Sequence, residues 1–299
     1  MDGHYEHVFR VFPKSEPHTV AKAQEGRWRL ITAAALPVQV VWTMLFGKMN
    51  DLEIRNWHAT PSAQGIPIPH GGWVLARRMM RARGLDYELD KRAWDFNAPG
   101  WVFQMDLDLR TRLVRGGGER WRVVAERLYD DAFRHALLLF SDGIVLRQEF
   151  HGFMKSGIVN TISTNSHAQY FQHTLALRRL GHRRFVNMIA AGDDVLMAEP
   201  PPGYVEELER TGCRVKFCRP GHAFLGYDWA HAPMPLYLGR HVWHFQIAAL
   251  CDLGQTVEAY AGHWCHDAKM YAFWAEVGRL CGLPVKSIEY YRAWFDCEE

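Results

Sequence analysis

The longest uncharged stretch of the chain runs from Leu30 to Phe46. Four residues interrupt its apolar pattern, namely Thr32, Pro37, Gln39 and Thr43. Because the stretch falls short of the about 20 apolar residues that a membrane-spanning helix needs, we expect no transmembrane segment here. The interpretation is a buried helix that follows a short basic strand at Arg27-Trp28-Arg29.

Shorter apolar blocks predict a mixture of strands and helices. Residues 57–73 are rich in Pro and Gly, which predicts a loop. The apolar run Phe185–Ala191 ends at Gly192-Asp193-Asp194 and resumes at Val195–Met197, a pattern typical of a β-hairpin with two acids at its tip. The other expected elements are a charged helix over Gly72–Arg83, a strand over Tyr87–Trp94, a helix over 203–211, a strand over Arg214–Phe217 and a mostly helical tail from about Tyr237.

Composition indicates how large a hydrophobic core the chain can form and how strong the electrostatic field of the whole chain is. The chain has 299 residues and is 48% hydrophobic, so we expect one compact unit with subdomains. Since 35 Lys and Arg residues are balanced by 33 Asp and Glu residues, any nucleic-acid site must be local. The most basic region lies between Arg110 and Arg127 and is broken by Gly116-Gly117-Gly118. A solvated helix face with a flexible loop and a contact with an RNA backbone are both open interpretations of this region.

Six cysteines are scattered through the last third of the chain, and the N-terminus lacks the layout of a secretory signal. No CxxC pair is present, and the spacing of Cys213, Cys218 and His222 matches no common set of zinc ligands. We therefore favour reduced thiols in a cytoplasmic protein over a zinc site.

Two pairs of carboxylates stand at predicted strand ends. Asp90 and Asp95 are five residues apart near the end of one strand, and Asp193 and Asp194 form the hairpin tip. Each pair alone is weak support for a site, because solvated acids are common and Gly-Asp-Asp is a favourable turn in any protein.

The segment between the two pairs adds a polar helix face. It begins with Ser156-Gly157 and continues with Thr161, Asn165 and Ser166, which recur about one helical turn apart. Hydroxyl and amide groups on one face can donate and accept hydrogen bonds to a sugar, which suits ribose recognition. An N-capped helix with incidental polar residues is the alternative interpretation of this segment alone.

In this order, the motifs resemble those of the RNA-dependent RNA polymerases of positive-strand RNA viruses, most closely the sobemovirus-like (solemovirus) group. The resemblance extends from Phe12-Pro-Lys-Ser-Glu16-Pro17-His18 to about Tyr237. Its parts are a basic fingers motif at Arg27-Trp-Arg29, palm motifs at Asp90–Asp95, Ser156–Ser166 and Gly192–Asp194, a lysine-bearing motif at Gly212–Lys216 and a primer-gripping turn at Phe224–Gly226. It implies template-directed RNA synthesis by nucleotidyl transfer from ribonucleoside triphosphates, replicating a viral RNA genome.

The fold that this resemblance implies is an α+β right-hand polymerase, with an antiparallel palm sheet backed by helices, partial fingers and a small helical thumb. We expect residues 1–299 to form a single polymerase core. Its expected parts are the fingers with their basic motif over 1–85, the palm over 86–110 and 150–228, a fingers insert over 111–149 and the thumb over 229–299. Enzymes of the group are longer, so we expect either a fragment or a compact enzyme.

The resemblance also implies the catalytic chemistry. Asp90, Asp193 and Asp194 would hold two Mg²⁺ (or Mn²⁺) ions, hard cations that prefer oxygen ligands. Two such ions can activate the attacking 3′-hydroxyl and neutralise the leaving pyrophosphate. Lys216 would be the general acid that protonates the pyrophosphate.

Substrate binding is implied by the remaining motif residues. Arg27 and Arg29 would bind the triphosphate with help from Lys14 and Lys22, since guanidinium groups match phosphate oxygens in pairs. The other expected substrate-binding residues are Asp95, Ser156, Gly157, Thr161 and Asn165. Among them, Asp95 would contact the ribose 2′-hydroxyl together with Asn165 and either Ser156 or Thr161.

The expected partners are an RNA template and primer, ribonucleoside triphosphates and other viral replication proteins, and the expected location is the host cell cytoplasm, in viral replication complexes. Three alternatives differ from this interpretation. A reverse transcriptase usually carries a bulky aromatic residue where this chain has Asp95 and Asn165. A metal-dependent nuclease or phosphatase explains the aspartates but not the polar segment from Ser156 to Ser166. A non-catalytic palm-like RNA-binding module or an incomplete polymerase fragment would keep the shape without the activity.

Overall fold

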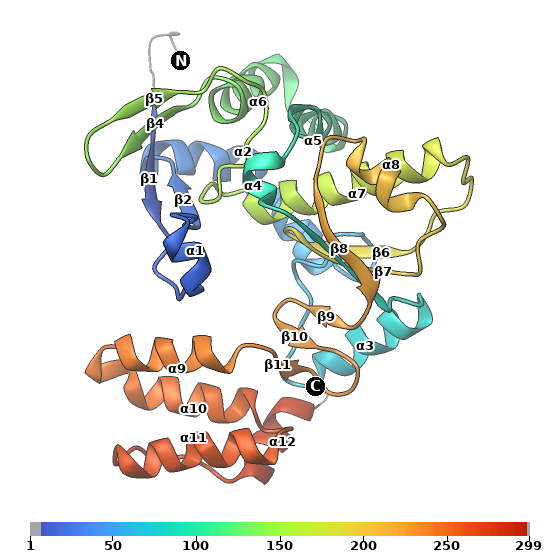
Figure 1. Cartoon of the computed structure of the whole chain (residues 1–299). Helices are drawn as coiled ribbons and strands as arrows, with labels where there is room; N and C mark the ends of the chain where they lie inside the picture. The colour runs from blue at the N-terminus through green and yellow to red at the C-terminus, as the bar shows by residue number, and fades with distance from the viewer. Residues whose placement is uncertain (1–6, 298–299) are drawn as a thin grey trace.

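The computed structural model describes residues 7–297, and its elements form three groups (Figure 1). A sheet with its helices, here the N-terminal sheet, lies at the upper left of the view. A second sheet backed by helices, the central sheet, lies at the right, and a set of helices, the C-terminal bundle, lies at the lower left.

The central sheet has four antiparallel strands, and both of its faces are buried. The strand order is β6 (Met188–Ala191), β7 (Asp194–Met197), β3 (Tyr87–Lys91) and β8 (Val215–Pro220). Because successive side chains of a strand point to opposite faces, Met188 and Ala190 join the main core while Ile189 joins a second core. Burial on both faces explains the apolar run Met188–Ala191, whereas Phe185, at the start of the predicted run, lies before the strand and is exposed.

Helices cover the two faces of the central sheet. The main core also holds side chains of α5 and α7, and the second core holds those of α3 and the preceding Pro- and Gly-rich loop. The helices concerned are α3 (Gly72–Ala82), α4 (Trp94–Asn97), α5 (Gly100–Leu113), α7 (Thr161–Arg179) and α8 (Tyr204–Glu209). The antiparallel sheet backed by helices agrees with the α+β fold that the sequence predicts.

The N-terminal sheet combines strands from two distant parts of the chain. Its order is β2 (Leu30–Ala33), β1 (Val8–Pro13), β4 (Leu137–Phe140) and β5 (Val145–Arg147), in which β1 pairs parallel with β4. Its associated helices are α1 (Val20–Gln24), α2 (Leu36–Arg55) and α6 (Gly118–Phe133). Residues near both ends of the first half of the chain therefore belong to one structural group.

The C-terminal bundle follows a small three-stranded sheet and confirms the predicted helical tail. The sheet is formed by β9 (Ala223–Phe224), β10 (Tyr227–Asp228) and β11 (Met234–Pro235). The bundle consists of α9 (Leu238–Ile247), the short η1 (Leu250–Asp252), α10 (Leu253–His263), α11 (Ala268–Leu280) and α12 (Ile288–Asp296). It has its own core around Trp274 and Phe295.

The predicted helix over Leu30–Phe46 is wrong in its first part. Residues Leu30–Ala33 pair with β1 as strand β2, and the helix begins at Leu36 with Pro37 in its first turn. Proline is favoured there because the first turn needs no backbone donor. The helix is also only partly buried, since Leu36 and Met44 are 76% and 79% exposed.

Two further predictions need correction. The strand expected over Tyr87–Trp94 ends at Lys91, because Ala93 takes a left-handed conformation with a φ of 46° and α4 begins at Trp94. In the Arg110–Arg127 region, the solvated-face interpretation is wrong for Arg110, which is 1% exposed and paired with Asp106.

Other arginines of that region do lie on a helix surface. Arg122 is half-exposed and pairs with Glu119 and Glu126, and Arg127 pairs with Asp131. Between residues 7 and 297, no helix combines the length and apolar character that crossing a membrane requires.

Candidate active site

The tip of the β6–β7 hairpin is held by its glycine and by helix α7. Gly192 has a φ of 69°, a left-handed conformation that glycine adopts without steric penalty. Its amide donates a hydrogen bond to Ser166 Oγ over 3.0 Å. Ser166 Oγ in turn donates to the carbonyl oxygen of Ile162, one turn earlier in α7, over 2.9 Å. Asp193 and Asp194 are thus placed by the sheet and by this helix together.

Asp90 lies beside the hairpin tip because β3 is the neighbour of β7. Leu89 pairs with Val195 of β7, and on the other side Asp90 pairs with Phe217 of β8. The Asp90 carboxylate accepts a hydrogen bond from Lys216 Nζ over 2.6 Å. Since these side chains are 37% and 55% exposed, the ion pair is of the weak, solvent-screened kind.

The three aspartates line one cavity of about 400 Å³. Lys14 and Arg29 reach the cavity from the N-terminal sheet, where they follow β1 and precede β2. The remaining lining includes Leu225 and Gly226 from the turn between β9 and β10, and Tyr237 and Arg240 from the start of the C-terminal bundle. Segments far apart in the sequence therefore meet around the carboxylates.

Burial and the neighbouring carboxylates raise the pKa of Asp194. Burial raises the pKa of Asp194 to about 6, the carboxylates of Asp193 and Asp90 raise it in the same direction, and Arg29 opposes them. A site with several carboxylate oxygens and unrelieved repulsion fits a hard divalent cation.

The carboxylates do not yet form a closed ligand set. Among residues 7–297, no group of three or more His, Cys, Asp or Glu side chains is drawn together closely enough to hold a metal ion. Asp90 is engaged by Lys216 instead. The donor chemistry fits Mg²⁺ or Mn²⁺, and Asp90, Asp193 and Asp194 are the residues that would converge on such an ion.

Asp95 lies in the first turn of α4 and is not among the residues that line the cavity. Its Oδ2 accepts a hydrogen bond from Ser156 Oγ over 2.7 Å. Burial raises the pKa of Asp95; the Ser156 hydrogen bond lowers it, nearby Asp193 raises it, and Arg29 and Lys14 lower it. The charges that influence Asp95 are thus an aspartate of the hairpin tip and two cations that line the cavity.

Asn165 joins helix α7 to helix α4. Its Oδ1 accepts a hydrogen bond from Trp94 Nε1 over 2.7 Å, and the residue is 4% exposed. The predicted polar face of α7 therefore contacts neighbouring elements at both Asn165 and Ser166.

Gly157 and Thr161 shape the turn that enters α7. The Gly157 amide donates to Thr161 Oγ1 over 3.2 Å, and that hydroxyl donates to the carbonyl oxygen of Ile158 over 2.7 Å. Gly157 has a φ of 147°, and a Cβ at this position would lie 2.8 Å from the carbonyl oxygen of Thr32. Only glycine fits between this turn and strand β2 without a shift of the backbone.

The two predicted triphosphate-binding arginines differ in position. Arg29 lines the cavity and pairs with Glu16 over 2.7 Å, whereas Arg27 pairs with Glu25 and is not among the lining residues. Glu16 also pairs with Lys14 Nζ at 3.0 Å, so one carboxylate contacts both of these cavity-lining cations. The predicted helper Lys22 is likewise absent from the described lining.

Sequence patterns missed the contribution of the C-terminal bundle. The Arg240 guanidinium lies 4.9 Å from the ring centre of Tyr237, and both side chains line the cavity. No motif spacing marks these residues, because they approach the aspartates only through the tertiary fold.

The site has an aspartate-bearing β-hairpin, a third aspartate on the adjacent antiparallel strand and cations from a second sheet. This arrangement is typical of the palm fold of nucleic-acid polymerases. The fold is similar to that of the Sicinivirus 3Dpol RNA dependent RNA polymerase, with a TM-score of 0.74 and 17% sequence identity, covering 96% of this chain and 66% of that chain. Residues 3–212 match the family described as viral RNA-dependent RNA polymerase, and the chain belongs to this family.

Curated relatives agree with the family assignment. The chain is 30% identical over 277 residues to the RNA-directed RNA polymerase of Mushroom bacilliform virus, covering 90% of this chain and 63% of that protein. It is 33% identical over 222 residues to the replicase polyprotein P2AB of Southern cowpea mosaic virus, covering 73% of this chain and 21% of the polyprotein. The chain thus spans less than two thirds of the length of these relatives. The sobemovirus relative agrees with the group predicted from the motifs.

Proposed function

We propose that this chain catalyses template-directed RNA synthesis, transferring nucleotides from ribonucleoside triphosphates to the 3′ end of an RNA primer and so copying a viral RNA genome. One observation carries the proposal: Asp90, Asp193 and Asp194 line the same cavity as Lys14 and Arg29. Carboxylates and cations around one space suit a substrate that carries both divalent metal and triphosphate.

In this proposal, Asp90, Asp193 and Asp194 hold two Mg²⁺ or Mn²⁺ ions. Bound there, the ions would favour deprotonation of the 3′-hydroxyl and neutralise the pyrophosphate. Arg29 and Lys14, both paired with Glu16, would hold the triphosphate in the same cavity. The reaction forms a bond between the 3′-oxygen and the α-phosphorus and breaks the bond from that phosphorus to the pyrophosphate.

Lys216 is the proposed general acid. Its ammonium group can donate a proton to the leaving pyrophosphate, and its present partner is the Asp90 carboxylate. A divalent cation held by Asp90 would compete with Lys216 for this carboxylate, which would leave the exposed lysine free to donate its proton to the leaving group.

Ribose selection is assigned to the elements beside the cavity. Asp95, paired with Ser156, and Asn165, paired with Trp94, are the groups proposed to face the 2′-hydroxyl. Gly157 and Thr161 keep the turn that presents Ser156 in shape. Arg27 lies on the same segment as Arg29 and would contact the outer phosphates.

The proposed partners follow from the family. They are an RNA template with its primer, ribonucleoside triphosphates and other viral replication proteins. Since the curated relatives are viral replicase proteins, the proposed setting is the infected host cell, in replication complexes of the cytoplasm.

The test is incorporation of labelled ribonucleotides on a primed RNA template with Mg²⁺ or Mn²⁺. We expect activity in the wild type, loss of activity in Asp193→Asn, and wild-type activity in Asp51→Asn, a matched change at an exposed position of α2. Equal activity in Asp193→Asn and the wild type would contradict the metal-binding role of the hairpin tip.

The second candidate is a non-catalytic RNA-binding module or an incomplete fragment. It is favoured by one observation, that the chain spans 63% of the Mushroom bacilliform virus polymerase. A folded wild type that binds labelled RNA and extends no primer would support this candidate and exclude the catalytic proposal for the chain alone.

A further inference from the structure

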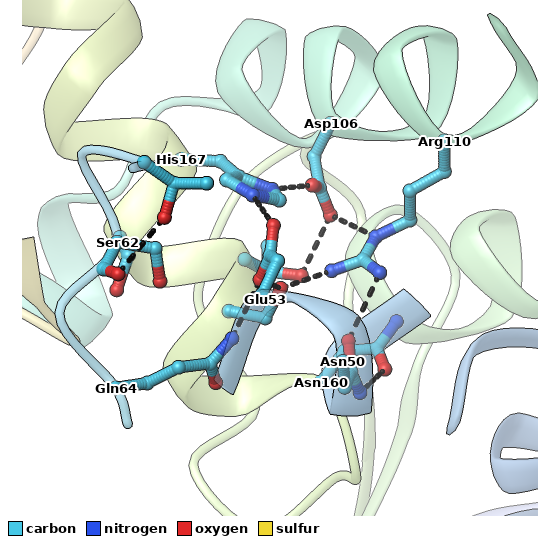
Figure 2. A network of polar contacts seen from close by, with 12 residues as sticks. Asn50, Glu53, Ser62, Gln64, Asp106, Arg110, Asn160 and His167 are labelled. Atoms are coloured by element: carbon cyan, nitrogen blue, oxygen red, sulfur yellow. Dashed lines mark hydrogen bonds and ion pairs between the residues drawn. The ribbon is translucent and has the colours of Figure 1, made fainter. Parts of the chain in front are cut away.

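Four ionisable groups from three helices, two of them buried and two partly buried, meet in one network (Figure 2). Glu53 comes from α2, Asp106 and Arg110 from α5, and His167 from α7. Asp106 is fully buried and Arg110 is 1% exposed. We call these four residues the charge network; none of them belongs to the motifs of the proposed reaction.

His167 links the two carboxylates of the charge network. Its Nδ1 lies 2.5 Å from Asp106 Oδ1, and its Nε2 is hydrogen-bonded to Glu53 Oε1. Both partners are acceptors only, so both ring nitrogens donate and the ring is an imidazolium. Burial lowers the pKa of His167, but the hydrogen bonds and charges of Asp106 and Glu53 outweigh it and raise the pKa to about 9.

The charges of the network balance. Arg110 Nε donates to Asp106 Oδ2 over 3.1 Å, so two cations face two carboxylates. Arg110 Nη1 also donates to Asn50 Oδ1 over 3.1 Å. A buried charge is costly without a partner, so removal of one member leaves an uncompensated charge in the core.

Hydroxyl groups tie the charge network to one turn of α7. Ser163 Oγ donates to Glu53 over 2.8 Å and accepts from Arg110 Nη2 over 2.7 Å. Thr164 Oγ1 donates to Asp106 Oδ2 over 2.6 Å. The same carboxylate oxygen accepts from Tyr129 of α6 over 2.5 Å. Positions 163, 164 and 167 of α7 are therefore held by side chains of α2 and α5.

Two other residues of the same turn contact the elements of the candidate active site. Asn165 accepts from Trp94 at the start of α4, and Ser166 accepts from the Gly192 amide at the hairpin tip. Because these residues belong to one helical turn, both sets of hydrogen bonds constrain the same stretch of backbone.

We propose that the charge network is a positioning device for nucleotide selection: it holds α7 at the height where Ser166 meets Gly192 and Asn165 meets Trp94. The inference rests on the proposed RNA synthesis for its kinetic readout. The effect on the hydrogen bond from the Gly192 amide to Ser166 can be measured without any enzymatic activity. Glu53 and His167 are thereby positioning residues, because they touch neither substrate nor reacting atoms.

The test compares His167→Gln, the double variant Glu53→Gln/His167→Gln and the control His135→Gln, an exposed histidine that pairs with Asp130. In His167→Gln we expect the KM for ribonucleotides to rise and the preference over 2′-deoxyribonucleotides to fall by about two- to tenfold, the range that one net hydrogen bond supplies. The double variant removes one charge of each sign, so it should recover part of the preference. The control should match the wild type.

Hydrogen exchange of the Gly192 amide supplies a readout that needs no activity. We expect faster exchange at this amide in His167→Gln and partial recovery in the double variant. If His167→Gln lowers the melting temperature while KM, sugar preference and Gly192 exchange remain those of the wild type, the network is merely structural and the inference is overturned. If the wild type incorporates no nucleotide, the proposed function fails, and Gly192 exchange still decides the positioning role.

Discussion

At the scale of single residues, the candidate site depends on which partner each charged side chain contacts. Lys216 illustrates this, since its ammonium group is anchored on Asp90 although the proposed chemistry needs it at the pyrophosphate. The pair is partly exposed, so its contribution to the free energy of unfolding is small. Catalysis and stability can therefore be separated at this position.

We expect Lys216→Ala to lower kcat by about 100-fold or more, the usual contribution of a general acid. The free energy of unfolding should change by less than about 1 kcal/mol, because an exposed ion pair is lost. Single-turnover incorporation and urea unfolding measure the two quantities, with Lys48→Ala on the exposed surface of α2 as the matched control. An unchanged kcat would remove Lys216 from the mechanism.

At the scale of elements, the packing of α2, α5 and α7 depends on ionised groups in the core. Glu53 lies on α2, Asp106 on α5 and His167 on α7, so the contacts among these side chains join the three helices. The pKa of His167 is raised to about 9 in the folded protein. In the unfolded chain a histidine has a pKa of about 6.5. A raised folded-state pKa stabilises the fold when the group is protonated, that is, at the lower end of this pH window.

The stabilisation by His167 is expected to amount to about 3 kcal/mol at most. It should be fully present below about pH 6.5, decline between about pH 6.5 and 9, and vanish above about pH 9. Urea unfolding of the wild type and His167→Gln at about pH 6 and about pH 9.5 measures the difference between the two proteins. A difference that does not shrink with rising pH would show that His167 is not an imidazolium in the fold.

At the scale of the whole molecule, the cavity is built by all three groups of elements. The central sheet supplies the aspartates, the N-terminal sheet supplies Lys14 and Arg29, and the C-terminal bundle supplies Arg240. The bundle is further tied to the small sheet, since the Tyr227 hydroxyl and His263 Nδ1 are hydrogen-bonded over 2.6 Å. A cation from the bundle should therefore take part in holding the RNA.

We expect Arg240→Ala to weaken the binding of primed RNA more than it lowers kcat, because the loss is one phosphate contact. The slope of log affinity against log salt concentration should become shallower by about 0.7 to 0.9. Fluorescence anisotropy over a salt series measures this slope. Arg279→Ala, an exposed arginine of α11 that pairs with Glu276, is the control and should keep the wild-type slope. An unchanged slope for Arg240→Ala would place the RNA elsewhere.

Local patterns were sufficient where a residue's environment is set by its neighbours in the chain. The hairpin that presents Asp193 and Asp194, the strand before Asp90 and the helical tail all follow from short-range periodicity and turn chemistry. Local patterns failed at Leu30–Ala33, which forms a strand only because β1 lies beside it. They also failed at Arg110, where a residue of a basic run is buried against Asp106.

The amino-acid sequence by itself determined the order of the motifs, the chemical types of the site residues and the family to which they point. Only the tertiary structure decided which side chains share a space: Arg29 but not Arg27 at the cavity, Arg240 from the distant bundle, and the charge network between α2, α5 and α7. The physical reason is that hydrogen bonds and ion pairs act over a few ångströms in space, regardless of separation along the chain. Sequence spacing controls such distances only within one turn or one hairpin.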